Sequence, residues 1–134
     1  MKFAEVVFNV AGVYGLLSLP PMYFLESRIS IDNPPAITHP EFFYGFLGVA
    51  LAWQAMFFVI GNDPARYRPA MIPAVLEKLS FGGAVLILYA LGRVSLSTVF
   101  FGLVDSVFCV LFIAAYIASR GKPSVGHDGS AKDR

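Results

Sequence analysis

The chain has 134 residues, of which 57% are hydrophobic and 14% are charged. This apolar share is well above that of an ordinary water-soluble domain and indicates an integral membrane protein. Ten Lys and Arg side chains nearly balance nine Asp and Glu side chains, which excludes a strongly basic nucleic-acid-binding protein. Four spans of about 20 residues each would occupy about 80 positions, so a single membrane domain accounts for the chain.

The first two spans are predicted from long uncharged runs. Twenty uncharged residues lie between Glu5 and Glu26, and they cover about 30 Å, one hydrocarbon thickness. A cleaved signal peptide is disfavoured because Leu-Pro-Pro-Met stands where a small-residue cleavage site would be. The second span follows Thr38-His39-Pro40-Glu41, which fits a Ser/Thr-x-x-Glu capping box with Thr38 as N-cap and His39 as a helix-start residue.

The third and fourth spans contain charged residues. The uncharged run from Leu79 to Gly92 has only 14 residues, about 21 Å of helix, so the third helix must begin near Met71 and include Glu77 and Lys78. Gly92 suits the left-handed position after the last turn. Ser95 can cap the fourth helix, in which Asp105 is the only charged residue.

The fold class expected is all-α, a polytopic four-transmembrane-helix bundle. The domain covers residues 1–118, with spans at about 4–24, 40–61, 71–91 and 96–118. The short connections at 92–95 and 62–69 indicate that spans three and four, and spans two and three, are antiparallel neighbours. Residues 26–41 are expected to form a rigid polar outer loop, and residues 119–134 a polar mobile tail.

The distribution of positive charge predicts the orientation. If the N-terminus is cytoplasmic, seven Lys and Arg residues lie on that side and two on the other. This bias follows the positive-inside rule and places both termini in the cytoplasm. With no organelle signal in the sequence, we expect a bacterial inner membrane. The seven are Lys2, Arg66, Arg68, Arg120, Lys122, Lys132 and Arg134, and the two are Arg28 and Arg93. Arg66 and Arg68 are interpreted as topology determinants and lipid-headgroup contacts.

Several polar residues fall at membrane depth. Counting the helical rise puts Asn9, Gln54 and Glu77 each about 9 Å from the inner boundary. Because lipid offers these groups no partners, we expect them to face inward, with Glu77 accepting hydrogen bonds from both amides. Lys78 lies about 100° around the helix from Glu77. It is therefore expected not to pair with Glu77 but to extend towards the inner headgroups.

Asp105 lies higher, at about 19 Å from the inner boundary. It shares a small polar face with Ser106 and Cys109, and its neighbours by depth are Tyr14 and Ser80, either of which could donate to its carboxylate. Two interpretations remain open for these groups: interhelical clamps, or a ligand or proton site, which an intramembrane carboxylate favours. The candidate site residues are Asn9, Tyr14, Gln54, Glu77, Lys78, Ser80 and Asp105.

Small residues predict the surfaces where helices approach closely. These are the pairs Ala11 and Gly15, Gly48 and Ala52, and Gly82 and Gly83. Their spacing is typical of packing between membrane helices rather than of a ligand site.

The sequence lacks the residues of several chemistries. No span contains His, which excludes haem bound through paired imidazoles. The lone Cys109 excludes both a disulfide in the outer loop and a dithiol relay. There is no His-Glu-x-x-His, Gly-x-Ser-x-Gly or Gly-Lys-Ser/Thr motif, so hydrolase and nucleotidase functions lack their residues. We expect no cofactor and no metal.

Part of the chain resembles small uncharacterised bacterial four-span membrane proteins. The segments are Thr38-His39-Pro40-Glu41-Phe42-Phe43-Tyr44-Gly45, Asn62-Asp63-Pro64-Ala65-Arg66-Tyr67-Arg68-Pro69 and Leu76-Glu77-Lys78-Leu79-Ser80. In size the chain is also similar to the small multidrug resistance transporters, but their essential glutamate lies well inside the first span, whereas Glu5 is at the membrane edge. DoxX-like proteins share only the size and helix count.

These observations favour a non-enzymatic ligand-binding or assembly bundle. Its expected partners are the lipid bilayer, a small apolar ligand, and a membrane protein or second copy of the chain, without nucleic acid. The first alternative is a small proton-coupled transporter that uses Asp105 and Glu77. The second is a membrane-embedded isomerase or reductase that uses these carboxyl groups as acid and base.

Overall fold

The structure is a computed structural model that describes residues 2–121. Residues 122–134, most of the predicted tail, lie outside the described part. The elements in chain order are α1 (Lys2–Met22), α2 (Glu26–Asp32), α3 (Pro40–Asn62), the 3-10 turn η1 (Arg68–Ala70), α4 (Met71–Ala90) and α5 (Leu96–Ala118). Between residues 2 and 121 there is no strand.

Four of these helices are long and apolar enough to cross a membrane: α1, α3, η1 with α4, and α5. Their outward faces carry large apolar side chains, such as Leu17, Val49 and Phe100, which are 62 to 72% exposed. Such faces would be unfavourable in water but match the hydrocarbon of a bilayer. The predicted fold class, an all-α polytopic membrane protein, is confirmed.

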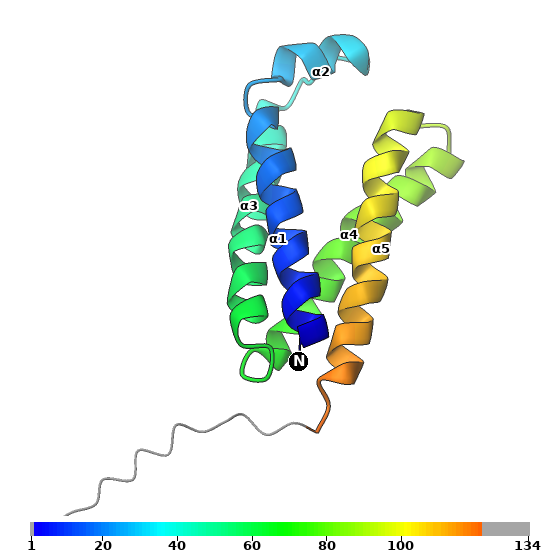
Figure 1. The fold of residues 1–134 in the computed structure, drawn as a ribbon. Coiled ribbons are helices and arrows are strands. Elements are labelled where there is room, and N and C mark those ends of the chain that lie inside the picture. Colours follow the sequence, from blue (N-terminus) through cyan, green and yellow to red (C-terminus); the bar gives the residue numbers. More distant parts are fainter. Residues whose placement is uncertain (1, 122–134) are drawn as a thin grey trace, which may run out of the picture.

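The four long helices form two closely packed antiparallel pairs, α1 with α3 and α4 with α5 (Figure 1). Helix α1 also packs on α5 and joins the pairs. The start of α1 and the end of α5 lie at the same end of the molecule (Figure 1). The neighbours expected from the turn at 92–95 are confirmed. Helices α3 and α4 are antiparallel neighbours, as expected, but they diverge from their short connection and do not form a closely packed pair (Figure 1). Their side chains still meet, for example at the Phe46 and Phe81 rings, whose centroids are 5.7 Å apart.

An aromatic core joins α1, α3 and α5. Phe8, Phe57 and Phe112 are each 0% exposed. The rings of Phe8 and Phe112 stack with centroids 4.2 Å apart, and Phe57 meets Phe112 edge-on at 5.0 Å. Such pairs contribute about 0.5–1.5 kcal/mol each beyond the area they bury. This core holds the two helix pairs together.

Glycines set how closely the paired helices approach. A Cβ atom on Gly82 of α4 would meet Ser106 Oγ at 2.7 Å, and one on Gly102 of α5 would meet Val85 Cγ1 at 2.5 Å. Gly15 of α1 faces the Gln54 side chain in the same way. The predicted packing surfaces at Gly15 and Gly82 are therefore confirmed.

Two other glycines that were expected at helix contacts do not lie against a neighbouring helix. A Cβ on Gly83 would meet nothing within 4 Å, and one on Gly48 would meet only the Tyr23 hydroxyl, at 3.7 Å. Ala52, the partner expected for Gly48, is exposed. The small-residue pattern predicts that a helix can be approached closely, but it does not decide which side a neighbour occupies.

The expected polar loop at 26–41 contains the short helix α2. Its turns are supported by the Arg28–Asp32 ion pair at 2.7 Å, an i, i+4 contact. Glu26 Oε2 accepts a hydrogen bond of 2.6 Å from the Tyr44 hydroxyl of α3, which fastens α2 to the bundle. The prediction of a loop is thus wrong for residues 26–32, because these local and tertiary contacts stabilise a helix.

The helix boundaries follow turn chemistry only in part. Gly92 has a φ of +67° after the end of α4, as predicted. Ser95 occupies the N-cap position of α5, but its hydroxyl bonds the side chains of Asn33, Ser97 and Thr98 and makes no cap bond to the backbone. The capping box at Thr38 does not form: His39 is the N-cap of α3 and makes no side-chain cap bond. Pro40 instead takes the first helical position, where its fixed φ suits the helix and its missing N–H costs nothing.

The glycine contacts predict unequal effects of two alanine substitutions. Gly102→Ala should destabilise the protein by about 1–3 kcal/mol, because the new methyl overlaps the stiff β-branched side chain of Val85. Gly83→Ala on the facing helix meets open space, and alanine favours the helix by about 1 kcal/mol. Thermal unfolding in detergent should give a lower Tm for Gly102→Ala and an equal or higher Tm for Gly83→Ala. Equal Tm values for the two variants would contradict the close approach of α4 and α5.

Candidate functional site

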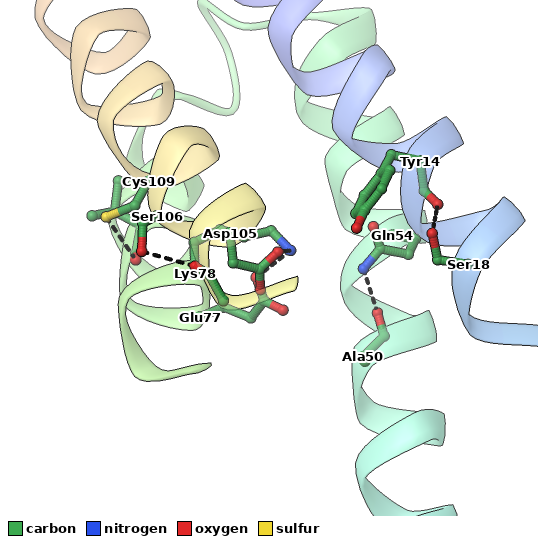
Figure 2. Close-up of polar contacts among 11 residues, drawn as sticks. Tyr14, Ser18, Ala50, Gln54, Glu77, Lys78, Asp105, Ser106 and Cys109 are labelled. Carbon is green, nitrogen blue, oxygen red and sulfur yellow. Dashed lines mark hydrogen bonds and ion pairs between the residues drawn. The ribbon is translucent and has the colours of Figure 1, made fainter. Parts of the chain in front are cut away.

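Three ionisable side chains meet inside the membrane domain. Lys78 Nζ lies 3.2 Å from Asp105 Oδ1, to which it donates a hydrogen bond, and 3.3 Å from Glu77 Oε2 (Figure 2). The contact with Glu77 is an ion pair without hydrogen-bond geometry. We call Glu77, Lys78 and Asp105 the charged cluster. The Lys78 side chain is 6% exposed, so its ammonium depends on these two carboxylates instead of water.

Three helices position the charged cluster. Glu77 and Lys78 are on α4, and Asp105 is on α5, which the contacts at Gly82 and Gly102 bring close to α4. The Phe57 ring of α3 lies 5.2 Å from Lys78 Nζ. A ring face attracts a cation, and the attraction is strongest where water is excluded. The ammonium is thus held between two carboxylates and one aromatic face.

The charges in this cluster do not balance. With all three groups ionised, two carboxylates face one ammonium, which leaves a formal charge of −1. Among residues 2–121, no second Lys or Arg pairs with either carboxylate. An uncompensated charge in a low-dielectric interior is costly. A proton or a bound cation would neutralise the cluster.

Glu77 also lines an open groove between α3 and α4. The groove has a volume of about 540 Å³ and exists because these two helices diverge. Glu77 is its only ionisable lining residue and Ser80 its only hydroxyl. The Glu77 side chain is 17% exposed, about three times as much as that of Lys78 at 6%. The other lining residues are Phe46, Val49, Ala50, Trp53, Pro73, Leu76, Phe81 and Ala84.

The two amides do not join Glu77 as expected. Asn9 Nδ2 donates to the Glu5 carbonyl, and Gln54 Nε2 donates to the Ala50 carbonyl, each at 2.8 Å within its own helix (Figure 2 shows the second). Side chains of this kind can bond the backbone one turn earlier and need no partner helix. The predicted three-helix polar layer is therefore wrong, since equal depth does not place residues on facing sides of their helices.

The Asn9 and Gln54 side chains occupy the space beside glycines of the facing helix, between α1 and α3. Gln54 lies against Gly15, and Asn9 lies against Gly61, where an added Cβ would come within 2.7 Å of Asn9 Nδ2. Gln54 is 2% exposed, and its Oε1 atom has no hydrogen-bond partner. Their observed role is packing between paired helices.

The hydroxyl groups predicted beside Asp105 make other contacts. Ser80 Oγ donates to the Leu76 carbonyl at 2.6 Å, and the Tyr14 ring packs on Phe108 with centroids 5.7 Å apart. Within residues 2–121 neither hydroxyl donates to Asp105, whose hydrogen-bond partner is Lys78. The expectation that Tyr14 or Ser80 donates to Asp105 is wrong, because Lys78 turns into the bundle and takes that place.

The position of Lys78 is the main feature that sequence reasoning missed. Although neighbouring side chains leave a helix in different directions, the flexible four-carbon stem carries the ammonium back to Glu77. The same stem reaches along the bundle to Asp105, so the two carboxylates share one ammonium and do not lie in separate layers. The sequence held two signals for this pairing. Lys78 and Asp105 are opposite charges within spans, and their spans are antiparallel neighbours joined by a short turn.

The aromatic side chains around the cluster could not be found from the sequence. Phe57 and Trp53 are two of many aromatic residues in the spans, and no spacing marks them. The described residues contain no group of three or more His, Cys, Asp and Glu side chains that could hold a metal ion.

Comparison of the chain with protein-family models, curated proteins and solved structures finds no match. The class of the protein therefore follows from the structure itself: it is an all-α membrane protein with four helices that can cross a bilayer. Its distinguishing feature is the charged cluster beside the α3–α4 groove.

Removing the central ammonium should be costly. Lys78→Met leaves two buried carboxylates facing each other without a cation, and breaking a buried pair in this way costs about 3–5 kcal/mol. Arg28→Gln is the matched control, because it breaks an ion pair whose arginine side chain is 71% exposed and should cost at most about 1 kcal/mol. Thermal unfolding in detergent measures both effects.

A double variant tests the cause of this loss. Lys78→Met combined with Asp105→Asn removes the cation together with one carboxylate, and should recover part of the stability lost in Lys78→Met. If Lys78→Met unfolded at the temperature of the Arg28→Gln control, the buried ion pairing would be refuted.

Proposed function

We propose that the protein is a non-enzymatic membrane protein that binds an apolar, positively charged ligand in the α3–α4 groove. One observation carries this proposal: Glu77 belongs to a cluster with one excess carboxylate and also lines an otherwise apolar groove. A ligand cation beside Glu77 would supply the missing positive charge. The ligand's apolar body would contact the aromatic and aliphatic walls.

The shape of the groove supports entry from the bilayer. The groove is open, and side chains on its rim, such as Phe46, Val49 and Leu76, are 44 to 63% exposed. Such a surface would face acyl chains, in which an apolar ligand concentrates. Its walls supply the apolar lining, and Glu77 the single oriented polar group, that are typical of small-molecule sites.

The distribution of the carboxylates favours binding over catalysis. Acid–base catalysis by a pair of carboxyl groups needs both within reach of the reacting atoms. Glu77 lines the groove, whereas Asp105 does not and hydrogen-bonds Lys78. A ligand in the groove would therefore meet one carboxyl group, which favours a binder over an isomerase or reductase.

The shared ammonium favours proton-coupled transport as a second candidate. A proton on Glu77 would leave Lys78 paired with Asp105, and release of this proton would prepare the groove for a cation. Uptake into proteoliposomes that depended on an imposed pH gradient, and that Glu77→Gln abolished, would favour the transporter. Saturable binding without such uptake would favour the simple binder.

We further propose that both termini lie in the cytoplasm of a bacterium and that the spans cross its inner membrane. Arg66 and Arg68 precede α4, and Arg120 follows α5, at the end of the bundle where α1 begins (Figure 1). Arg28 and Arg93 lie in the connections at the opposite end. This asymmetry supports the orientation that the positive-inside rule predicts.

Fusions to the C-terminus test this orientation. A green fluorescent protein fusion should fluoresce and an alkaline phosphatase fusion should be inactive, since the first protein matures in the cytoplasm and the second folds in the periplasm. The matched control inserts the same reporters in the 92–95 connection, where the two signals should be reversed. An active phosphatase at the C-terminus would contradict the proposal.

The binding proposal is tested with Trp53, the single tryptophan, which lines the groove. Tetraphenylphosphonium should quench its fluorescence saturably in detergent, whereas the similarly shaped anion tetraphenylborate should bind much more weakly. Glu77→Gln should weaken binding of the cation about tenfold or more, equivalent to about 1.4 kcal/mol. Glu41→Gln, whose side chain is 64% exposed in the wild type, should bind like the wild type.

The two ions separate charge recognition from simple apolar partitioning. Equal quenching by cation and anion, or equal affinity of Glu77→Gln and Glu41→Gln, would contradict the role of Glu77. Glu77→Gln must retain the Tm of the wild type within a few degrees for its affinity to be compared.

A further inference from the structure

A second site lies at the other side of α4, where η1 and α4 meet the end of α5. Arg68 Nε and Nη2 both donate to the Tyr116 carbonyl, at 3.3 and 3.2 Å. The Arg68 guanidinium also lies over the Tyr116 ring, with Cζ 3.9 Å from its centroid. These contacts fix the plane of a half-buried guanidinium group. A guanidinium has five N–H donors, so three of them remain for another acceptor.

A second arginine, Arg120, lies near the same Tyr116 ring. Arg120 Cζ lies 6.0 Å from the Tyr116 ring centroid, and Arg120 is exposed. Within residues 2–121 neither Arg68 nor Arg120 forms an ion pair with a carboxylate. Two cations on one ring therefore leave positive charge available for an external anion.

An apolar crevice lies beside the Tyr116 ring that the two arginines contact. It runs between α4 and α5, has a volume of about 180 Å³, and is lined by Ile72, Val75, Leu76, Ile113 and Tyr116 without a polar surface. Tyr116 belongs to both features: its ring is contacted by the arginines and also lines the crevice. The positive charge of the two arginines thus lies next to a small apolar crevice.

We propose that this site binds one anionic phospholipid, with its phosphate at Arg68 and Arg120 and an acyl chain in the crevice. The planar guanidinium donors of arginine match phosphate oxygens. Basic pockets between spans on the cytoplasmic side are typical binding places for anionic headgroups. The arginine pair and Glu77 belong to different sites, and Leu76 is the one residue that lines both the crevice and the α3–α4 groove. The proposal therefore does not depend on the ligand proposed beside Glu77.

Thermal unfolding in detergent with added lipid tests the site. Palmitoyl-oleoyl phosphatidylglycerol should raise the Tm of the wild type more than the matching phosphatidylcholine does. The increment due to the anionic headgroup should disappear in Arg68→Gln/Arg120→Gln and persist in the control Arg93→Gln. Comparing the two lipids within each variant separates lipid recognition from any loss of stability when the Tyr116 carbonyl loses its donor.

Two further arms identify the source of the anion and the role of the crevice. Inorganic phosphate at the same concentration should not reproduce the shift, because it has no acyl chain. Ile113→Trp should fill the crevice and weaken phosphatidylglycerol retention about fivefold or more in native mass spectrometry, without removing an arginine. Equal shifts with both lipids, an unchanged increment in the double arginine variant, a full shift with inorganic phosphate, or wild-type retention by Ile113→Trp would each overturn the proposal.

Discussion

The ammonium of Lys78 is the group on which the interior of this protein depends. A cation that is 6% exposed in a membrane domain requires opposite charge close by. Asp105 supplies it from α5 and Glu77 from α4, while Phe57 of α3 presents its ring. Because these partners come from three helices, satisfying one charge constrains how the two helix pairs meet.

The glycine contacts and the aromatic core make that arrangement possible. Gly82 and Gly102 let α4 and α5 approach until Lys78 can reach Asp105, and Phe8, Phe57 and Phe112 fasten the pairs together. Elsewhere α3 and α4 separate, which opens the groove beside Glu77. The site is thus a consequence of packing: small residues hold each pair tightly, α1 and α5 join the pairs, and only the side between α3 and α4 remains open.

The features that depend on local sequence, namely the spans, the turns and the charged residues within the spans, could be predicted from the sequence. The number of spans depends on the length of apolar runs, which must match the hydrocarbon thickness. Gly92 and Ser95 marked a tight turn, because a left-handed residue and an N-cap are local requirements. All three members of the charged cluster were also identified as intramembrane candidates, since a charge in an apolar run is conspicuous wherever its partner lies.

Which side chains meet was decided only by the tertiary structure. Asn9, Gln54 and Glu77 share a predicted depth. In the structure, however, Asn9 and Gln54 pack between α1 and α3, whereas Glu77 pairs with Lys78 and lines the groove. Depth follows from the rise per residue, but the direction in which each helix turns its side chains depends on the rotation, tilt and neighbours of the whole helix. Lys78 shows the same limit: its long stem allows either a headgroup or a buried carboxylate, and only the position of α5 selects Asp105.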